Sequence, residues 1–186
     1  MNWNIPNILT IGRLIAAPCV ALVFVLFDRP LADWLAFWIF VGAGATDFLD
    51  GWLARRWGQV SELGKMLDPI ADKAMVIIAL SMIVALGGLT NLLVVPMAII
   101  LTREILISGV REFLGDFKLP VTKAAKFKTT CQMLAIGTLF LFFATGEPML
   151  SFIGYAILWI AAGLTFLTGW DYFSKAMTHL REREKT

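Results

Sequence analysis

Histidine and cysteine are nearly absent from this chain of 186 residues, which has one histidine and two cysteines. A metal site made of histidine and cysteine needs several of these ligands, so the single histidine, His179, cannot form one by itself. Cys19 and Cys131 lie within apolar stretches, so we expect them to act as small hydrophobic residues and not to form a disulfide. A metal site in this protein would therefore have to rely on oxygen ligands.

Charged residues are also few. They make up 16% of the chain, against 59% hydrophobic residues and a mean hydropathy of +0.77. A soluble domain of this length does not need so much apolar surface, whereas an integral membrane protein does. The first residues, MNWNIPNILTIGR, lack the basic n-region of a secretory signal peptide, so we do not expect cleavage there. No internal repeat, low-complexity tract or linker is visible, and we expect a single membrane domain over residues 1–186.

Six apolar runs predict an all-α integral membrane protein with six transmembrane helices. The runs are 14–27, 34–46, the two halves of 74–102 on either side of Gly87-Gly88, 129–146 and 148–170. Ahead of them, Trp3, Ile5, Ile8 and Leu9 predict a short N-terminal segment lying at the membrane interface. Of the 16 Lys and Arg residues, only Arg29 falls in a turn on the opposite side of the membrane from the rest. The positive-inside rule then predicts that both termini are cytoplasmic.

The stretch DFLDGWLARRWGQVSELGKMLDPIAD contains two pairs of aspartates. Asp47 and Asp50 are three residues apart on the chain, and the members of the second pair, Asp68 and Asp72, are four apart. Each pair therefore lies on one face of its helix. Ionised side chains at or near membrane depth are unfavourable and so indicate a functional site. Carboxylates without nearby histidine or cysteine suit Mg²⁺ or Mn²⁺, and two such ions would clamp a diphosphate.

Small residues follow the first aspartate pair at helical spacing. Gly51 lies four residues after Asp47, and Ala54 lies four residues after the second aspartate, Asp50. This face therefore lacks bulk one turn later, which lets a flat ligand or another backbone approach closely. Arg55, a further turn along, can pair a phosphate with its planar guanidinium. The spacing indicates a ligand site, since helix caps and loop charges need neither four acids nor this stripe of small residues.

The pattern D-x-x-D-G-x-x-A-R, followed by G-x-x-x-D-x-x-x-D, resembles the signature of the CDP-alcohol phosphotransferases at every fixed position. In this chain the pattern comprises Asp47, Asp50, Gly51, Ala54, Arg55, Gly64, Asp68 and Asp72. The resemblance implies that the four aspartates bind two divalent ions, and that Asp72 is also the base that accepts the proton of the acceptor hydroxyl. It further implies that the donor, CDP-diacylglycerol, is bound by the small residues and the arginine of the pattern, namely Gly51, Ala54, Arg55 and Gly64.

A second group of basic residues lies outside this pattern and outside the charged C-terminal tail. Arg103 and Arg111 are eight residues apart, so they project from roughly the same helix face, about two turns apart. Together with Arg13 and Lys126 they predict a pocket for a second phosphate, distinct from the diphosphate. The alternative is that these residues only contact anionic lipid headgroups on the cytoplasmic side.

Three further motifs resemble the phosphatidylglycerophosphate synthase branch of this family. They are N-I-P-N-x-L-T-x-x-R from Asn4, R-E-I-x-I-S-x-x-R-E from Arg103 and K-x-K-T from Lys126. The resemblance implies transfer of a phosphatidyl group from CDP-diacylglycerol to sn-glycerol 3-phosphate, with release of CMP. It also implies a homodimer among the lipids of the cell inner (plasma) membrane, with its active site facing the cytoplasm and no nucleic-acid partner.

Other interpretations are open on the sequence alone. The acceptor alcohol could instead be inositol phosphate, serine or phosphatidylglycerol, within the same family. A small ion-coupled secondary transporter also uses intramembrane carboxylates, but it predicts an internal repeat and acids near the bilayer midplane. Glu104 and Asp171 either orient an arginine of the phosphate pocket or are ordinary charges at helix ends.

Overall fold

The computed structural model of the protein describes residues 5–57, 62–114 and 123–183, and all of its regular structure within them is α-helical. The helices are α1 (Ile5–Leu26), α2 (Leu31–Trp57), α3 (Glu62–Gly87), α4 (Asn91–Leu114), α5 (Lys123–Thr145) and α6 (Pro148–Arg183). The predicted break at the paired glycines is confirmed, since α3 ends at Gly87 and Gly88 has a φ of 81°. Only glycine adopts this left-handed conformation at little cost, which is why the chain turns there.

Several helices extend beyond the apolar runs that predicted them. Ile5 and Leu9 belong to the first turns of α1 and do not form a separate segment, so the expected interfacial segment is not present from Ile5 onward. Helix α6 continues past Trp170 to Arg183. An apolar run marks the part of a helix that suits a membrane, but a helix ends only where capping, glycine or proline stops it, and residues 171–183 contain neither glycine nor proline.

Within the described residues five helices are long and apolar enough to cross a membrane, and the chain is a multi-pass membrane protein. These spans are Asn7–Leu26, Met66–Gly87, Asn91–Leu114, Phe127–Thr145 and Pro148–Arg181. Helix α2 is not among them, because its side chains are described consecutively only over residues 31–47, a stretch too short to be assessed as a span. Membrane crossing by α2, which the count of six requires, stays a prediction.

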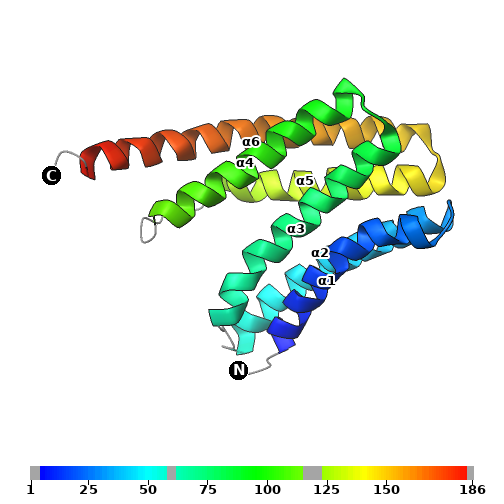
Figure 1. The fold of residues 1–186 in the computed structure, drawn as a ribbon, viewed down its shortest axis with the longest axis horizontal. Coiled ribbons are helices and arrows are strands. Elements are labelled where there is room, and N and C mark those ends of the chain that lie inside the picture. Colours follow the sequence, from blue (N-terminus) through cyan, green and yellow to red (C-terminus); the bar gives the residue numbers. More distant parts are fainter. Residues whose placement is uncertain (1–4, 58–61, 115–122, 184–186) are drawn as a thin grey trace.

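The six helices form two groups of three, which we call the first arm (α1–α3) and the second arm (α4–α6). In the first arm α1 packs against both α2 and α3, and in the second arm α6 packs against both α4 and α5. The arms are joined where α5 meets α2 and α3, and where α3 meets α4. Figure 1 shows the arms diverging from this junction, the first toward the N-terminus of the chain and the second toward its C-terminus.

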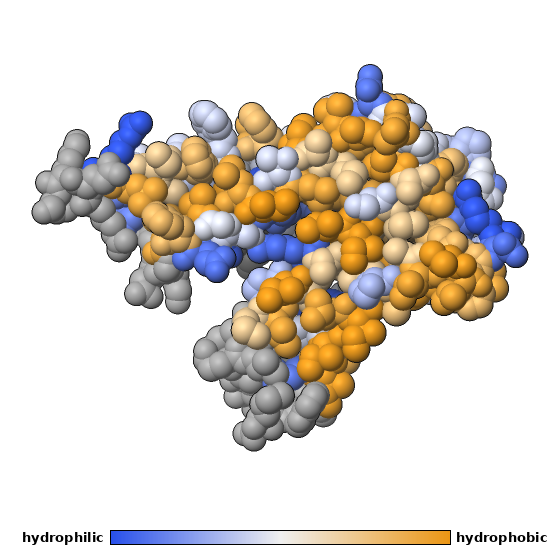
Figure 2. Space-filling view, viewed as in Figure 1, coloured by the Kyte–Doolittle hydropathy of each residue, from blue (hydrophilic) through white to orange (hydrophobic). Residues whose placement is uncertain are grey.

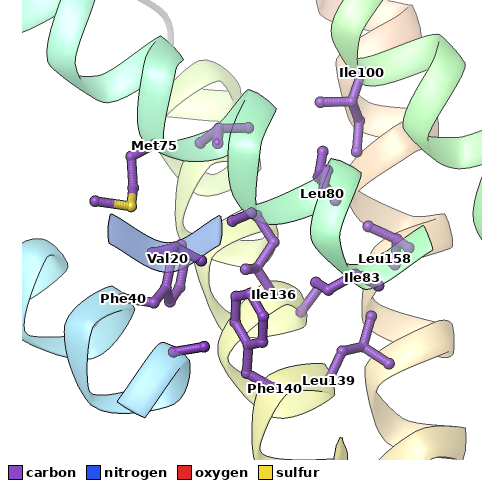
Figure 3. Packing of buried hydrophobic residues seen from close by; sticks show 14 of the residues in the cluster. Val20, Phe40, Met75, Leu80, Ile83, Ile100, Ile136, Leu139, Phe140 and Leu158 are labelled. Carbon is purple, nitrogen blue, oxygen red and sulfur yellow. The ribbon is translucent and has the colours of Figure 1, made fainter. Parts of the chain in front are cut away.

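The junction between the arms is the hydrophobic core. Phe40 of α2 and Phe140 of α5 have ring centroids 5.8 Å apart, and both side chains are almost fully buried. Figure 3 shows Ile83 of α3 and Ile136 of α5 in the same cluster. Between helices in a membrane the stabilisation comes mainly from close packing and not from removal of water. This packed junction fixes how the two arms diverge and therefore where the functional groups on each arm lie.

An ion pair stabilises the start of α2. Asp33 at the start of α2 is buried and accepts hydrogen bonds from Arg29 Nε at 2.8 and 3.1 Å. The guanidinium carbon of Arg29 also lies 5.9 Å from the ring centroid of Phe143, near the end of α5. A buried aspartate is stable only when it is paired, so Arg29 allows α2 to begin with a carboxylate against the core.

Candidate active site

Helix α1 carries a stripe of buried polar side chains within the first arm. Asn7, Thr10 and Arg13 are 3%, 1% and 3% exposed, although they lie on a helix made mostly of apolar residues. Their spacing of three residues puts them on one face. Because α1 packs against both α2 and α3, this face meets the segments that carry the aspartates.

Arg13 joins three of the predicted metal ligands. Its Nη1 donates hydrogen bonds to Asp47 on α2 and to Asp72 on α3, the latter at 2.5 Å. Its Nη2 lies 3.8 Å from Asp68 Oδ1, and Thr10 Oγ1 donates a hydrogen bond of 2.7 Å to the same oxygen. The structure therefore brings together three of the four aspartates, and it adds Arg13 and Thr10 to them.

The carboxylates of this cluster remain open on one side. Their side chains are 50% exposed for Asp47, 49% for Asp68 and 54% for Asp72, whereas the Arg13 side chain is 2% exposed. Among the described residues three carboxylates surround this one guanidinium, so the described part of the cluster has a net negative charge. A negative, oxygen-rich and partly exposed surface fits a hard divalent cation. As the side chains lie, no three acids, histidines or cysteines in the described part of the chain are close enough together to hold one metal ion.

Several predicted site residues have side chains outside the described part of the structure. Asp50, Gly51, Ala54 and Arg55 belong to α2, and Lys126 belongs to α5, but only the helical course of their backbone is described. Gly64 is described, and it is buried near the start of α3.

The second arm carries a buried cluster of both signs. Glu104 of α4 accepts hydrogen bonds from Arg103 Nη1 at 3.3 Å and from Lys128 Nζ of α5. The side chains are 17% exposed for Arg103, 15% for Glu104 and 5% for Lys128. Two cations share one carboxylate, so this cluster keeps a positive charge, opposite to that of the first arm. Arg103 Nε is buried and donates no hydrogen bond within the described residues, which leaves a donor for a ligand.

Helix α6 shapes the surroundings of both arginines on α4. A Cβ atom at Gly169 would lie 2.7 Å from Arg103 Cγ, so glycine is what lets the arginine pack against α6. The guanidinium carbon of Arg111 lies 5.8 Å from the ring centroid of Tyr172, in a cation–π arrangement. As the spacing predicted, Arg103 and Arg111 therefore project from a common side of α4, the side toward α6.

Two neighbouring hollows lie between α4 and α6. They have volumes of about 430 and 320 Å³, and they share Leu106 and Phe173 in their walls. Thr102 and Arg103 are the polar residues among the side chains that line them. An apolar groove with a cation in its wall is suited to an amphipathic molecule with a negatively charged group.

A notch separates the two arms. Figure 2 shows hydrophilic residues (blue) along it, within a surface that is otherwise largely hydrophobic (orange). The negative Arg13 cluster belongs to the first arm and the positive Arg103 cluster to the second. Arg13 therefore lies with the aspartates, and the structure records no contact between it and Arg103 or Arg111 among the described residues.

Some contacts of the site were not predicted. Thr10 was not assigned a role, although its spacing from Arg13 on one face of a helix was a usable signal. The predicted pocket includes Lys126, whereas the structure places Lys128 beside Glu104, because spacing alone does not say which of two lysines faces inward. Glu104 contacts Arg103, as expected of a residue that orients this arginine. Asp171 instead pairs with Lys175 on the exposed surface of α6, at 2.7 Å.

Comparison with known proteins agrees with this geometry. A family model described as CDP-alcohol phosphatidyltransferase matches residues 3–167. A Cereibacter sphaeroides protein is 48% identical, and the alignment covers 99% of this chain and 100% of the relative. A Rickettsia prowazekii protein is 42% identical, covering 96% of this chain and 98% of the relative. A Haemophilus influenzae protein is 40% identical, covering 95% of each.

All three relatives are named CDP-diacylglycerol–glycerol-3-phosphate 3-phosphatidyltransferase. The matched region includes every aspartate of the first arm and the Arg103 cluster of the second. With a family model over most of its length and relatives aligned from end to end, this chain belongs to the CDP-alcohol phosphatidyltransferase family.

Proposed function

We propose that this protein transfers the phosphatidyl group of CDP-diacylglycerol to sn-glycerol 3-phosphate, giving phosphatidylglycerophosphate and CMP. The relatives named for this reaction align with nearly the whole chain. The structural observation that carries the proposal is the pair of clusters of opposite charge on the two arms. A carboxylate cluster suits a metal-bound diphosphate, and a separate cationic cluster suits the phosphate of the acceptor.

The aspartates of the first arm are the proposed metal ligands. Asp47, Asp50, Asp68 and Asp72 would hold Mg²⁺ or Mn²⁺, two ions in all. Bound there, the ions would supply positive charge that stabilises the diphosphate and the departing CMP. The support from the structure is chemical: three of these carboxylates already gather around a cation, and their open side meets the solvent.

Asp72 is the proposed general base. The acceptor hydroxyl oxygen forms a bond to the phosphatidyl phosphorus, the bond from that phosphorus to the CMP oxygen breaks, and the hydroxyl proton passes to Asp72. The Asp72 side chain is 54% exposed, so a hydroxyl group can reach it. Its Oδ1 accepts a hydrogen bond of 2.5 Å from Arg13 Nη1, which holds the carboxylate beside the other aspartates.

The donor and acceptor subsites follow the sequence pattern. Gly51 and Ala54 would make room for the cytidine, and Arg55 would contact phosphate, with Gly64 in the same donor site. The acceptor phosphate would be bound by four basic residues, namely Arg13, Arg103, Arg111 and Lys126. For Arg103 the support is its unused Nε donor and its partly buried position beside Lys128. For Arg13 the support is weaker, because its guanidinium contacts the aspartates.

The proposed placement in the membrane has six spans, both termini in the cytoplasm and a cytoplasm-facing active site in the inner (plasma) membrane. The hollows between α4 and α6 would receive an acyl chain of the donor, since their walls are apolar apart from Thr102 and Arg103. A homodimer is proposed from the family resemblance, and a single-protomer mass in lipid nanodiscs would count against it.

The test is CMP release from CDP-diacylglycerol by the purified protein in detergent, with Mg²⁺ or Mn²⁺ and a panel of acceptors. We expect release only with sn-glycerol 3-phosphate. Release with inositol phosphate, serine or phosphatidylglycerol instead would keep the family reaction and correct the acceptor. Folded protein that releases no CMP with any acceptor or ion would contradict the proposed activity and favour an ion-coupled transporter.

A further inference from the structure

The position of Arg13 points to a role that differs from phosphate binding. Its side chain is buried, and among the described residues it pairs with three carboxylates: Asp47 from α2, and Asp68 and Asp72 from α3. Helices α2 and α3 have few direct contacts with each other in the described residues, whereas α1 packs against both. Arg13 is thus a cation that ties the aspartate-bearing ends of α2 and α3 together.

We propose that Arg13 is a built-in counter-ion of the aspartate site, and that a divalent ion and the Arg13 guanidinium compete for the same carboxylates. This inference rests on the proposed metal site, and it concerns how that site is loaded. Carboxylates that converge on one another repel, so they need a cation among them in order to stay together. Arg13 supplies that cation from within the chain.

The competition follows from charge and reach. Asp47 and Asp72 are both held by the same Nη1 atom, so these two carboxylates cannot approach an ion between them without lengthening their contacts with Arg13. A divalent ion at this position also repels the guanidinium. Asp68 is held differently, by Thr10 at 2.7 Å and by Arg13 only at 3.8 Å. Of the three carboxylates it can therefore exchange Arg13 for a divalent ion most easily. Arg13 is therefore a positioning residue. It lowers the affinity of the site for metal, and when no metal is bound it stabilises the first arm.

The experiment measures Mn²⁺ binding by purified protein in detergent, without either substrate, through the electron paramagnetic resonance signal of free Mn²⁺. The variants are Arg13→Gln, Arg13→Lys and the matched control Lys73→Gln. Lys73 follows Asp72 directly on α3 and makes no ion pair with a described residue, so its removal changes the nearby charge without removing the competing contact. Thermal unfolding of each variant is measured with and without Mn²⁺.

We expect Arg13→Gln to bind Mn²⁺ about tenfold more tightly than the wild type or better, and Lys73→Gln to change the dissociation constant by less than about threefold. Arg13→Lys should fall between the wild type and Arg13→Gln, because a lysine keeps the charge but lacks the second nitrogen with which the guanidinium approaches Asp68. Without Mn²⁺, Arg13→Gln should unfold at a lower temperature than the wild type, and Mn²⁺ should restore its stability.

The outcomes separate this inference from the proposal beneath it. Equal Mn²⁺ affinity in the wild type and Arg13→Gln, or an equal gain in Lys73→Gln, would overturn the competition and leave the metal site intact. Folded Arg13→Gln protein obtained only in the presence of Mn²⁺ would support the competition, because the ion then replaces the missing cation. A folded wild type that binds no Mn²⁺ would overturn the metal assignment itself, together with the role of Arg13.

Discussion

Asp72 has two proposed roles, metal ligand and general base, and one substitution separates them. Asp72→Asn keeps the size of the side chain and an oxygen ligand but cannot accept the proton. At saturating Mn²⁺ we expect kcat to fall by roughly 10²- to 10⁴-fold, with little change in binding of CDP-diacylglycerol. Turnover is measured as CMP release, and donor binding is measured by titration without acceptor.

The control for this substitution is Asp171→Asn. Asp171 is 55% exposed and pairs only with Lys175, so the same chemical change there should leave turnover within about twofold of the wild type. Near-normal turnover of Asp72→Asn would remove Asp72 from the base role and leave it as a metal ligand at most.

Arg103 is the arginine of the second arm that is best placed to bind a phosphate. It is partly buried, and its Nε has no acceptor within the described residues. Loss of a charge-assisted hydrogen bond is worth about 1.5–3 kcal/mol, so Arg103→Gln should raise KM for sn-glycerol 3-phosphate roughly 10- to 100-fold. Lys175→Gln, which removes an exposed charge, should not change KM. If both variants keep the wild-type KM, the basic residues contact lipid headgroups and do not bind the acceptor.

At the scale of helices, α6 contains two glycines, Gly163 and Gly169, whose replacement by alanine is expected to have different effects. At Gly169 an added Cβ would lie 2.7 Å from Arg103 Cγ, whereas at Gly163 it would meet no atom within 4 Å. Gly169→Ala should displace Arg103 and raise KM for sn-glycerol 3-phosphate. Gly163→Ala should leave KM unchanged and stabilise the helix by up to about 1 kcal/mol. Kinetics and thermal unfolding of the two variants test this, and equal KM values would show that Gly169 does not position Arg103.

Spacing within one helix was enough to predict part of the site. The separations within the aspartate pairs fix which side chains share a helix face, so Asp68 and Asp72 could be paired without a structure. The contact between Arg13 and Asp47 joins different helices, and it depends on α1 lying against both α2 and α3. No spacing within one helix contains that information. For this reason Arg13 was grouped with the other basic residues and not with the acids.

At the scale of the molecule, the positions of the arms suit a reaction between a lipid and a water-soluble phosphate. The clusters of opposite charge belong to different arms, and both arms diverge from one packed core. Apolar composition predicted the number of helices and the turn at Gly88, because glycine and charge interrupt an apolar run. It did not predict the length of α6.

The orientation of the molecule in the membrane can be tested with single cysteines in a variant that lacks Cys19 and Cys131. Leu89, 89% exposed in the turn between α3 and α4, is predicted to lie outside the cytoplasm, and exposed Arg181 near the end of α6 to lie inside it. A membrane-impermeant thiol reagent added to intact spheroplasts should label Leu89→Cys. It should label Arg181→Cys only after permeabilisation. The reverse pattern would invert the proposed topology.

The most direct test of the central claim is to identify the lipid product by mass spectrometry. Purified protein is incubated with CDP-diacylglycerol, sn-glycerol 3-phosphate and Mn²⁺, and the lipid product and CMP are quantified together. Transfer between two substrates predicts phosphatidylglycerophosphate and CMP in equal amounts, with no product when the acceptor is omitted. CMP accompanied by phosphatidate would mean that water is the acceptor, and it would contradict transfer to sn-glycerol 3-phosphate.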